Sequence, residues 1–394
     1  MPSARSWPGT DVSSMHSAES SIAWLESLSP WPEEFGLGRM RELLAALGEP
    51  QGAFPAVHVV GTNGKTTTTC LAAALLEGAG LGVGAYTSPH VTGWAERIRI
   101  GGREVDVETA LARVRRAAER VGATQFEVLT AAAFAAFAEA SVDAAVVEAG
   151  LGGRLDATNV LAAPVVVLTN VALEHTDVLG DSREAIAAEK LAVVREGATV
   201  VLGEPEWEGA ARAAGAGAVV VGGGSNLALA LAAAESLLGS PVSAEPAADL
   251  LLPGRLERAG DSPLEVRDGA HNLAAVGYSL PRLPAREDWV VVASILEDKD
   301  AAGMLAALSV LGDRLVATAS SNPRSLPAED LAALARPYFE RVEVVEAPVE
   351  ALSRARESAG PDGAVLVTGS LYLLADLASV RPQRLPWREA SASG

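Results

Sequence analysis

Strand-like and helix-like segments alternate along almost the whole chain, and no other feature limits the fold as strongly. An apolar run at residues 56–60 precedes a helical pattern at 66–79, and the same order recurs as far as a last apolar run at 364–367. Such alternation predicts mostly parallel sheets with helices on both faces. We therefore expect an α/β protein, with strands at residues 56–60, 83–86, 144–147, 165–168, 199–202, 218–221, 264–266, 290–293, 315–317, 342–345 and 364–367.

The chain is expected to form two domains. Its 394 residues are enough for two to three. The stretch 239–253 contains three prolines and little periodicity, and is the best candidate for a linker. We expect a larger domain over residues 21–250 and a smaller Rossmann-like α/β domain over 251–386. Residues 1–20 are polar, lack the apolar middle region of a signal peptide, and are expected to be a disordered tail.

Charge and cysteine content exclude several classes of protein. The 31 basic and 50 acidic residues give a net charge of −19, which argues against broad binding to nucleic acid or to anionic membranes. No apolar run reaches the roughly 18 residues of a membrane span. The single cysteine, Cys70, excludes an intrachain disulfide and fits a reducing cytosol. We expect a cytoplasmic monomer with small-molecule partners, and no nucleic-acid or membrane partner.

A glycine-rich loop directly follows the first predicted strand and opens the next helix. Its residues are Gly61, Thr62, Asn63, Gly64, Lys65, Thr66 and Thr67. Glycines let backbone N–H groups turn inward, the helix N-terminus adds a positive end, and a lysine reaches outer phosphates. The full phosphate-loop pattern requires a glycine where Val59 stands, so this loop is a shortened relative. A simple tight turn is the alternative, but the lysine and hydroxyls favour a nucleotide site.

Lysine is rare in this chain. Of the 31 basic residues only Lys65, Lys190 and Lys299 are lysines, so arginine supplies the general surface charge. A lysine amine can lose its proton and be modified, whereas an arginine side chain stays protonated. Retention of lysine therefore indicates a chemical requirement at Lys65 and Lys190. Chance is an equally good explanation for Lys299.

Three polar residues follow predicted strands. Ser88 lies in a loop after the second strand, Glu148 ends the strand at 144–147, and His175 comes shortly after the strand at 165–168. Parallel α/β folds place ligands at the carboxyl ends of strands. Histidine is an unusual ligand for Mg²⁺, which prefers oxygen, so the residues alone would suggest a borderline metal.

Seven further segments carry motif-like sequences in a fixed order: 35–47, 86–100, 148–159, 175–180, 253–257, 268–272 and 366–373. Together with the glycine-rich loop they resemble the motifs of the folylpolyglutamate synthase/dihydrofolate synthase family, within the Mur ligase superfamily. The resemblance spans roughly Ala23 to Leu377. It implies a phosphate-loop-containing ATPase domain followed by a glutamate-ligase domain. It also implies an enzyme that joins an amino acid to a carboxylate through an acyl phosphate, with ATP.

The resemblance assigns roles to the metal and nucleotide residues. It implies that Ser88, Glu148 and His175 hold a Mg²⁺ that bridges the ATP phosphates. Lys190 aligns with a lysine that CO₂ carbamylates, which would help to hold a second Mg²⁺; a surface lysine is the alternative. K⁺ is a further candidate cation. The residues expected to contact ATP in the second half, or to take part in catalysis with Lys65 and Lys190, are Asn226, Arg255, Asp268 and His271.

The resemblance also places the acceptor substrate. The residues that align with dihydropteroate-binding positions are Thr124, Gln125, Phe126, Glu127, Arg154, Leu155 and Asp156. Phe126 offers a face for stacking and Glu127 an acceptor for an aminopterin edge. Core packing is an equally good explanation for Phe126, and a capped strand-to-helix turn for the segment 268–272.

The resemblance predicts an ATP-dependent ligase that joins L-glutamate to dihydropteroate, to the terminal glutamate of a folate, or to both. Some residues depart from the family pattern. Thr66 and Thr67 look more like peptidoglycan-type Mur ligases, Glu174 replaces the usual aspartate, and Leu273 replaces a proline. A peptidoglycan-type ligase and a degenerate, non-catalytic nucleotide-binding protein therefore stay open as alternatives.

Overall fold

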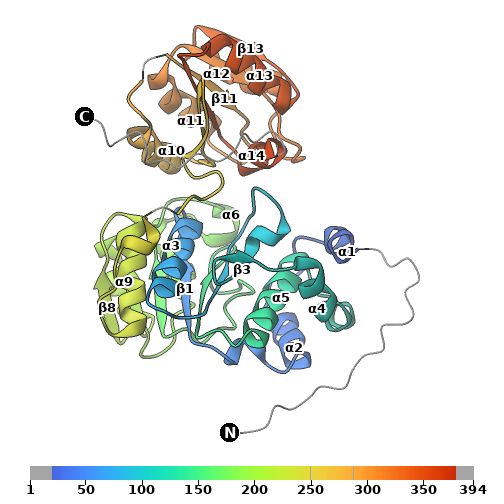
Figure 1. The fold of residues 1–394 in the computed structure, drawn as a ribbon, viewed down its shortest axis with the longest axis vertical. Coiled ribbons are helices and arrows are strands. Elements are labelled where there is room, and N and C mark those ends of the chain that lie inside the picture. Colours follow the sequence, from blue (N-terminus) through green and yellow to red (C-terminus); the bar gives the residue numbers. More distant parts are fainter. Residues whose placement is uncertain (1–19, 249, 287, 379–394) are drawn as a thin grey trace.

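The structure, a computed structural model, describes residues 20–248, 250–286 and 288–378. Two sheets, each covered by helices on both faces, form two bodies that follow one another along the chain (Figure 1). This confirms the predicted α/β class, with a larger parallel-sheet domain and a smaller Rossmann-like one. The predicted tail, apart from Ser20, and residues 379–386 lie outside the described residues.

The first sheet has eight strands within the described residues, in the order β4-β3-β2-β5-β1-β6-β7-β8. They are β1 (Ala56–Val60), β2 (Val83–Tyr86), β3 (Ile98–Ile100), β4 (Arg103–Glu104), β5 (Ala144–Glu148), β6 (Val165–Leu168), β7 (Thr199–Leu202) and β8 (Ala218–Val221). All pair in parallel except β3 and β4, which form an antiparallel edge beside β2. Strand β1 lies between β5 and β6, so the loop that follows it is flanked by the ends of two other strands.

Helices cover both faces of this sheet, and its central strands are therefore buried on both sides. The helices are α1 (Ser21–Ser27), α2 (Gly38–Ala46), α3 (Lys65–Gly78), α4 (Val107–Val121), α5 (Gln125–Glu139), α6 (Thr176–Leu179), α7 (Arg183–Leu191), α8 (Glu208–Ala213) and α9 (Asn226–Leu238). Val57 and Val59 of β1 pack with α3 and α9 on one face. Ala56 and Val60 face the other core, as period-two alternation requires.

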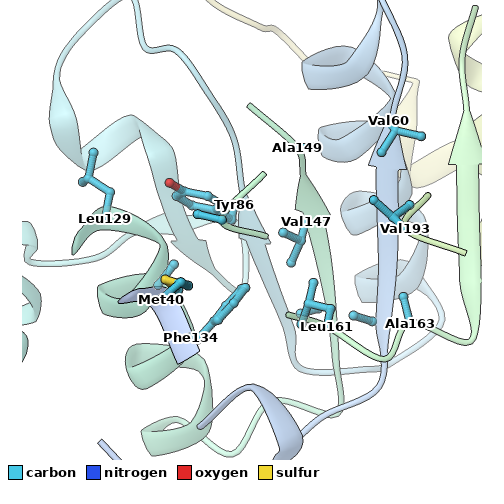
Figure 2. Close-up of a cluster of buried hydrophobic side chains, with 14 of the residues drawn as sticks. Met40, Val60, Tyr86, Leu129, Phe134, Val147, Ala149, Leu161, Ala163 and Val193 are labelled. Atoms are coloured by element: carbon cyan, nitrogen blue, oxygen red, sulfur yellow. The ribbon is translucent and has the colours of Figure 1, made fainter. Parts of the chain in front are cut away.

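Figure 2 shows part of the larger core, on the face of β1 opposite α3. Met40 of α2, Phe134 of α5 and Tyr86 of β2 gather there with Val147 of β5. All four are fully buried. Burial of apolar surface on this scale holds α5 against the sheet, and the first turn of α5 then reaches the end of β2.

The second sheet has the order β13-β12-β11-β14-β10-β9 over the described residues. Its strands are β9 (Glu257–Asp261), β10 (Leu264–Arg267), β11 (Trp289–Ala293), β12 (Arg314–Ala317), β13 (Arg341–Val344) and β14 (Ala364–Thr368). Its helices are α10 (Leu273–Ser279), α11 (Ala301–Leu308), α12 (Ala328–Ala335), α13 (Pro348–Ala359) and α14 (Leu371–Asp376). Only the edge strand β9 runs antiparallel to its neighbour in this sheet.

One apolar side chain of the first domain enters the core of the second. Val91, in the loop after β2, is 3% exposed and belongs to a cluster with Leu371 and Leu374 of α14. Gly254 lies against the same group, since a Cβ there would come within 2.7 Å of Leu374 and 3.2 Å of Val91. The two domains are therefore in direct apolar contact beside the segment that joins them.

The predicted strands coincide with the observed ones to within a residue or two. Local capping interactions set where the helices begin. Helix α5 begins at Gln125 because Thr124 and Glu127 form a capping box. Helix α7 begins after Ser182, whose side chain caps it, and ends at Leu191. The linker segment is partly ordered against the first domain: Pro246 packs on Gly78 at the end of α3.

A buried histidine lies on β1. His58 is 0% exposed, and its Nε2–H donates to Thr158 Oγ1 at 2.8 Å, because that hydroxyl itself donates to Asp156. Burial lowers the pKa of His58 to about 3. Among the described residues no acceptor is within reach of Nδ1, so a proton there would leave an unpaired buried charge.

We predict that His58 makes the fold sensitive to acid. The unfolded chain takes up the proton near pH 6.5 and the folded chain only near pH 3, so this contribution to stability is lost as pH falls from 6.5 towards 3. At pH 5 the loss is about 2 kcal/mol. A His58→Gln variant keeps an amide donor but does not titrate. Urea unfolding at pH 7 and pH 5 should show a smaller pH-dependent loss in the variant, and an equal loss in both proteins would contradict the prediction.

Candidate active site

A cavity of about 1480 Å³ lies between the two domains, at the carboxyl ends of β1, β5 and β6. Nearly all of the predicted site residues line it. These are Thr62, Asn63, Gly64, Lys65, Thr66, Thr67, Ser88, Thr124, Gln125, Phe126, Glu127, Glu148, Leu155, Asp156, His175, Lys190, Asn226, Arg255, Asp268 and His271. Gly61 and Arg154 do not: the Gly61 carbonyl accepts from Lys65, and Arg154 is exposed in an ion pair with Glu189.

The glycine-rich loop is held by the residues that follow β6. Asn63 N–H donates to Asn170 Oδ1 at 3.0 Å, and Asn170 Nδ2 donates back to the Asn63 carbonyl at 2.9 Å. A Cβ on Gly61 would lie 1.9 Å from Thr169 Oγ1, so only glycine fits there. Sequence reasoning missed Thr169 and Asn170. Their signal was a polar pair directly after an apolar strand beside β1.

Lys65 opens helix α3 and lies over its own loop. Its Nζ donates to the carbonyls of Gly61 at 2.9 Å and Thr62 at 3.0 Å. Gly64, which caps the helix, has a φ of 80° and lies against Asn226, where a Cβ would come within 2.4 Å of Oδ1. A flexible ammonium at the N-terminus of a helix is a favourable arrangement for binding phosphate.

Glu148 is a buried carboxylate beside this loop. It is 1% exposed; Oε1 accepts from Thr66 Oγ1 at 3.0 Å and Oε2 from the Ser88 N–H at 3.0 Å. Burial raises its pKa to about 7, and the positive charge of Lys65 opposes the rise. A carboxylate so poorly solvated fits a position next to a cation.

The predicted metal ligands share the cavity. Ser88, Glu148 and His175 all line it, and His175 begins α6 with a left-handed φ of 46°. Among the described residues no group of three or more His, Cys, Asp or Glu could hold a metal. The predicted set contains only two such residues and a hydroxyl. It therefore fits a divalent cation that takes further oxygen ligands from phosphate.

Lys190 is buried, which rules out the surface-lysine interpretation. It is 1% exposed, and its Nζ donates to Glu174 Oε1 at 2.7 Å and to the Gly61 carbonyl at 2.9 Å. Burial lowers its pKa to about 8, against the opposing charge of Glu174. The neutral amine is thus accessible near physiological pH, more than for an exposed lysine.

The loop after β5 holds helix α7, and with it Lys190, in place. A Cβ on Gly153 would lie 2.6 Å from the Lys190 carbonyl and 2.7 Å from that of Glu189. Asp156 organises the same loop by accepting from the N–H groups of Gly150 at 3.0 Å and Leu151 at 2.9 Å. The carboxylate of Asp156, predicted to contact the acceptor, is therefore engaged by its own loop.

The predicted acceptor residues at 124–127 form the first turn of α5. The Glu127 carboxylate accepts from the Thr124 N–H at 2.8 Å and from Arg39 Nε at 3.0 Å, so it caps the helix and joins it to α2. The ring of Phe126 backs onto Gly150, where a Cβ would come within 2.6 Å, and lies 6.1 Å from the Tyr86 ring. The side chain of Phe126 therefore both packs against neighbouring residues and lines the cavity.

The second domain contacts the phosphate loop directly. Asn272 and Asn63 exchange amide hydrogen bonds at 2.9 and 3.3 Å, and Arg255 Nη2 donates to Thr66 Oγ1 at 3.4 Å. The Asp268 carboxylate accepts from Leu256 N–H and other groups of its own domain. Asn272 also caps α10, so the segment 268–272 is a capped turn as well as a cavity wall.

Two further cavity residues carry chemistry. His271 Nδ1–H donates to the Gly269 carbonyl at 2.9 Å, which leaves Nε2 as the acceptor nitrogen, and burial lowers its pKa. Lys299, for which chance seemed as good an explanation, also lines the cavity, and its charge lowers the pKa values of His175 and His271. All three lysines of the chain thus line one cavity.

Two family models match the chain. Residues 59–228 match the Mur ligase middle domain, and residues 254–371 match the Mur ligase glutamate ligase domain. The fold and the site therefore belong to the Mur ligases, which are ATP-dependent enzymes that form amide bonds. No helix in the described ranges is long and apolar enough to cross a bilayer.

Relatives narrow the class. Dihydrofolate synthase/folylpolyglutamate synthase of Escherichia coli (strain K12) is 33% identical over 91% of this chain and 94% of that protein, and the Mycobacterium tuberculosis enzyme of the same name is 32% identical over 86% and 89%. A structure of E. coli FolC in complex with DHPP and ADP superimposes with a TM-score of 0.82 at 31% identity, covering 93% of this chain and 99% of that one. The chain belongs to the folylpolyglutamate synthase/dihydrofolate synthase family and is an ATP-dependent, amide-forming ligase.

We predict that Gly153→Ala abolishes most activity while the protein stays folded. The added methyl meets backbone atoms of α7, which cannot move aside as a side chain would, so the helix and Lys190 must shift. We expect kcat to fall roughly 100-fold, because misplacement by about 1 Å has that effect. Gly209→Ala is the control, since a Cβ there meets nothing within 4 Å. Equal activity of the two variants, with matching circular dichroism, would contradict the prediction.

Proposed function

We propose that the protein attaches L-glutamate to the carboxyl group of a pteridine acceptor, dihydropteroate or a folate, at the expense of ATP. The supporting observation is that one cavity is lined both by a phosphate loop and by apolar side chains, including Phe126 and Leu155. Its volume of about 1480 Å³ exceeds the roughly 300–1,000 Å³ of a site for one small ligand. It has room for a nucleotide and an acceptor together.

The first proposed step is phosphorylation of the acceptor carboxylate. Two anions must meet, so charge neutralisation and positioning provide most of the catalysis. Lys65 would neutralise negative charge on the phosphoryl group during its transfer. Ser88, Glu148 and His175 would hold a divalent cation, which neutralises phosphate charge when bound. A related Yersinia pestis enzyme in complex with Mn and AMPPNP, at a TM-score of 0.83 and 31% identity over 93% of this chain and 99% of that one, supports the use of a divalent cation with the nucleotide.

Carbamylation of Lys190 is part of the proposal. CO₂ reacts with a neutral amine, and burial lowers the pKa of Lys190 to about 8, so a useful fraction is neutral near pH 7.5. Carbamylation would turn the side chain of Lys190 from a cation into an anion, and its Nζ lies 2.7 Å from Glu174 Oε1. A buried anion next to Glu174 needs neighbouring cations to offset its charge, and Lys65 is one such cation.

The second proposed step is attack of the glutamate amine on the acyl phosphate, with loss of phosphate. The amine must lose protons, and His271 offers a neutral Nε2 within the cavity wall. Glutamate also brings two carboxylates. In the second domain, the described lysine and arginine residues that line the cavity are Arg255, Lys299 and Arg324. Arg255 contacts the phosphate loop, so Lys299 and Arg324 remain for these carboxylates.

We predict phosphate release only when Mg-ATP, L-glutamate and a pteridine acceptor are all present, with a product heavier by one glutamyl residue in mass spectrometry. Lys65→Met should lower kcat/KM by about 10²–10³-fold, the typical effect of losing a group that stabilises transition-state charge. Arg336→Met, which removes an exposed cation far from the cavity, is the control and should have little effect.

Each outcome of the assay separates the alternatives. Dihydropteroate and a folate are tested as separate acceptors, which distinguishes dihydrofolate synthase from folylpolyglutamate synthase activity. Turnover with a UDP-linked peptidoglycan precursor, and none with either pteridine, would support the peptidoglycan-type alternative instead. ATP binding without glutamate-dependent phosphate release would support a non-catalytic protein.

A further inference from the structure

A cluster of polar side chains lies beside the segment that follows β6, outside the site residues expected from the sequence. At its centre is Glu204, two residues after the end of β7. Its carboxylate accepts from the Val171 N–H at 2.9 Å, from Trp207 Nε1 at 2.8 Å, and from Arg183 Nη2 at 3.1 and 3.2 Å. A carboxylate offers about four acceptor positions. Glu204 lines the cavity, yet its oxygens are engaged by the protein itself.

Arg183, the first residue of α7, completes the cluster. Its Nε donates to the Val171 carbonyl at 2.9 Å, and its guanidinium carbon lies 5.2 Å from the centre of the Trp207 ring. Val171 and Trp207 are both buried. One ion pair therefore holds both backbone polar groups of Val171, the N–H through Glu204 and the carbonyl through Arg183. Arginine suits this role because its planar fork donates to two acceptors in fixed directions.

Val171 lies between the two residues that hold the phosphate loop. The Thr62 N–H donates to the Asn170 carbonyl at 2.9 Å, and the Ala172 N–H donates to Thr62 Oγ1 at 3.1 Å. Asn170 also holds Asn63 through its side chain. A displacement of Val171 therefore moves both of its neighbours, and with them the backbone of the loop.

The cluster reaches the loop by a second route. Arg183 begins α7, and Lys190 lies near the end of the same helix, where its Nζ donates to the Gly61 carbonyl at 2.9 Å. Loss of the ion pair weakens the hold on the start of that helix. Over the described ranges, neither Glu204 nor Arg183 has a hydrogen bond to α5 or to the second domain. Both routes thus end at the phosphate loop.

We propose that the Glu204–Arg183 ion pair is a positioning device for ATP, which sets the phosphate loop in the conformation that receives a triphosphate. Both residues act through Val171 and α7, and neither contacts a reacting atom. Loop amides bind phosphate only when their N–H groups converge on it, and a misplacement of about 1 Å costs about 100-fold in rate. The inference concerns nucleotide use by an ATP-dependent ligase, so it does not depend on which acceptor the enzyme takes.

Hydrogen exchange in the full-length, nucleotide-free protein tests the positioning directly. In Glu204→Ala the amides of Thr62 and Asn63 should exchange roughly tenfold faster than in the wild type, because their acceptor Asn170 is held less firmly. Mass spectrometry of peptides that cover the phosphate loop gives the rates. Unchanged exchange at the loop overturns the inference.

Glu206→Ala is the matched control. Glu206 also pairs with Arg183, at 2.7 Å, but has no hydrogen bond to Val171 within the part of the chain that the structure describes. The variant removes a carboxylate of the same cluster and should leave exchange at the loop as in the wild type. Glu204→Gln keeps an acceptor for the Val171 N–H but loses the ion pair. It should show a smaller increase, and it serves as the test if the alanine variant does not fold.

Nucleotide binding separates positioning from a merely structural role. Isothermal titration calorimetry with Mg-AMPPNP should give a Kd raised about 10- to 100-fold in Glu204→Ala, less in Glu204→Gln, and not at all in Glu206→Ala. In turnover, kcat/KM for ATP should fall by a similar factor while the KM for L-glutamate stays unchanged. A Glu204→Ala protein that is less stable to urea but binds Mg-AMPPNP like the wild type overturns the inference. A wild-type protein that binds Mg-AMPPNP but turns over no pteridine contradicts the proposed function instead.

Discussion

The carbonyl oxygen of Gly61 accepts hydrogen bonds from Lys65 and Lys190, two of the chain's three lysines, at 2.9 Å each. One lysine belongs to the helix that the phosphate loop opens, and the other to α7, more than a hundred residues further along. The contact therefore ties the loop after β1 to a separate helix and brings two ammonium groups together. Glu174 accepts from Lys190 and limits the resulting repulsion. Every proposed step involving phosphate depends on this arrangement.

Concentration of positive charge matters because the protein as a whole carries a net charge of −19. ATP, L-glutamate and the acceptor are all anions, so the outer surface repels them. Within the cavity the three lysines and Arg255 supply local positive charge, beside acidic lining residues such as Glu148 and Glu174. A low-dielectric cleft focuses such a field, and local charge then outweighs the average over the surface. This explains why the scarcity of lysine was informative: it is kept where a compact cation must approach oxygen atoms closely.

Sequence predicted the parallel strands well because each is a short apolar run, and the ordered motifs placed most cavity residues. It missed the antiparallel strands β3, β4 and β9, which are short or carry charged residues. It could not predict which side chains meet. Asn170 and Lys299 acquire importance only because the fold brings them to the cavity. Glu127 and Asp156 have contacts that the sequence did not reveal, since the carboxylate of Glu127 caps a helix and that of Asp156 braces a loop.

The contact between the two domains combines apolar packing with hydrogen bonds between neutral side chains. Val91 supplies apolar contact, while Asn63 and Asn272 supply a neutral amide pair. Separating neutral amides in water costs far less than separating a buried ion pair, so this part of the contact is readily broken and remade. Asn63 also anchors the phosphate loop through its backbone to Asn170. A shift of the second domain therefore acts on the loop through Asn63 and, by way of Arg255, through Thr66. Domain position is thus linked to the geometry that a triphosphate encounters.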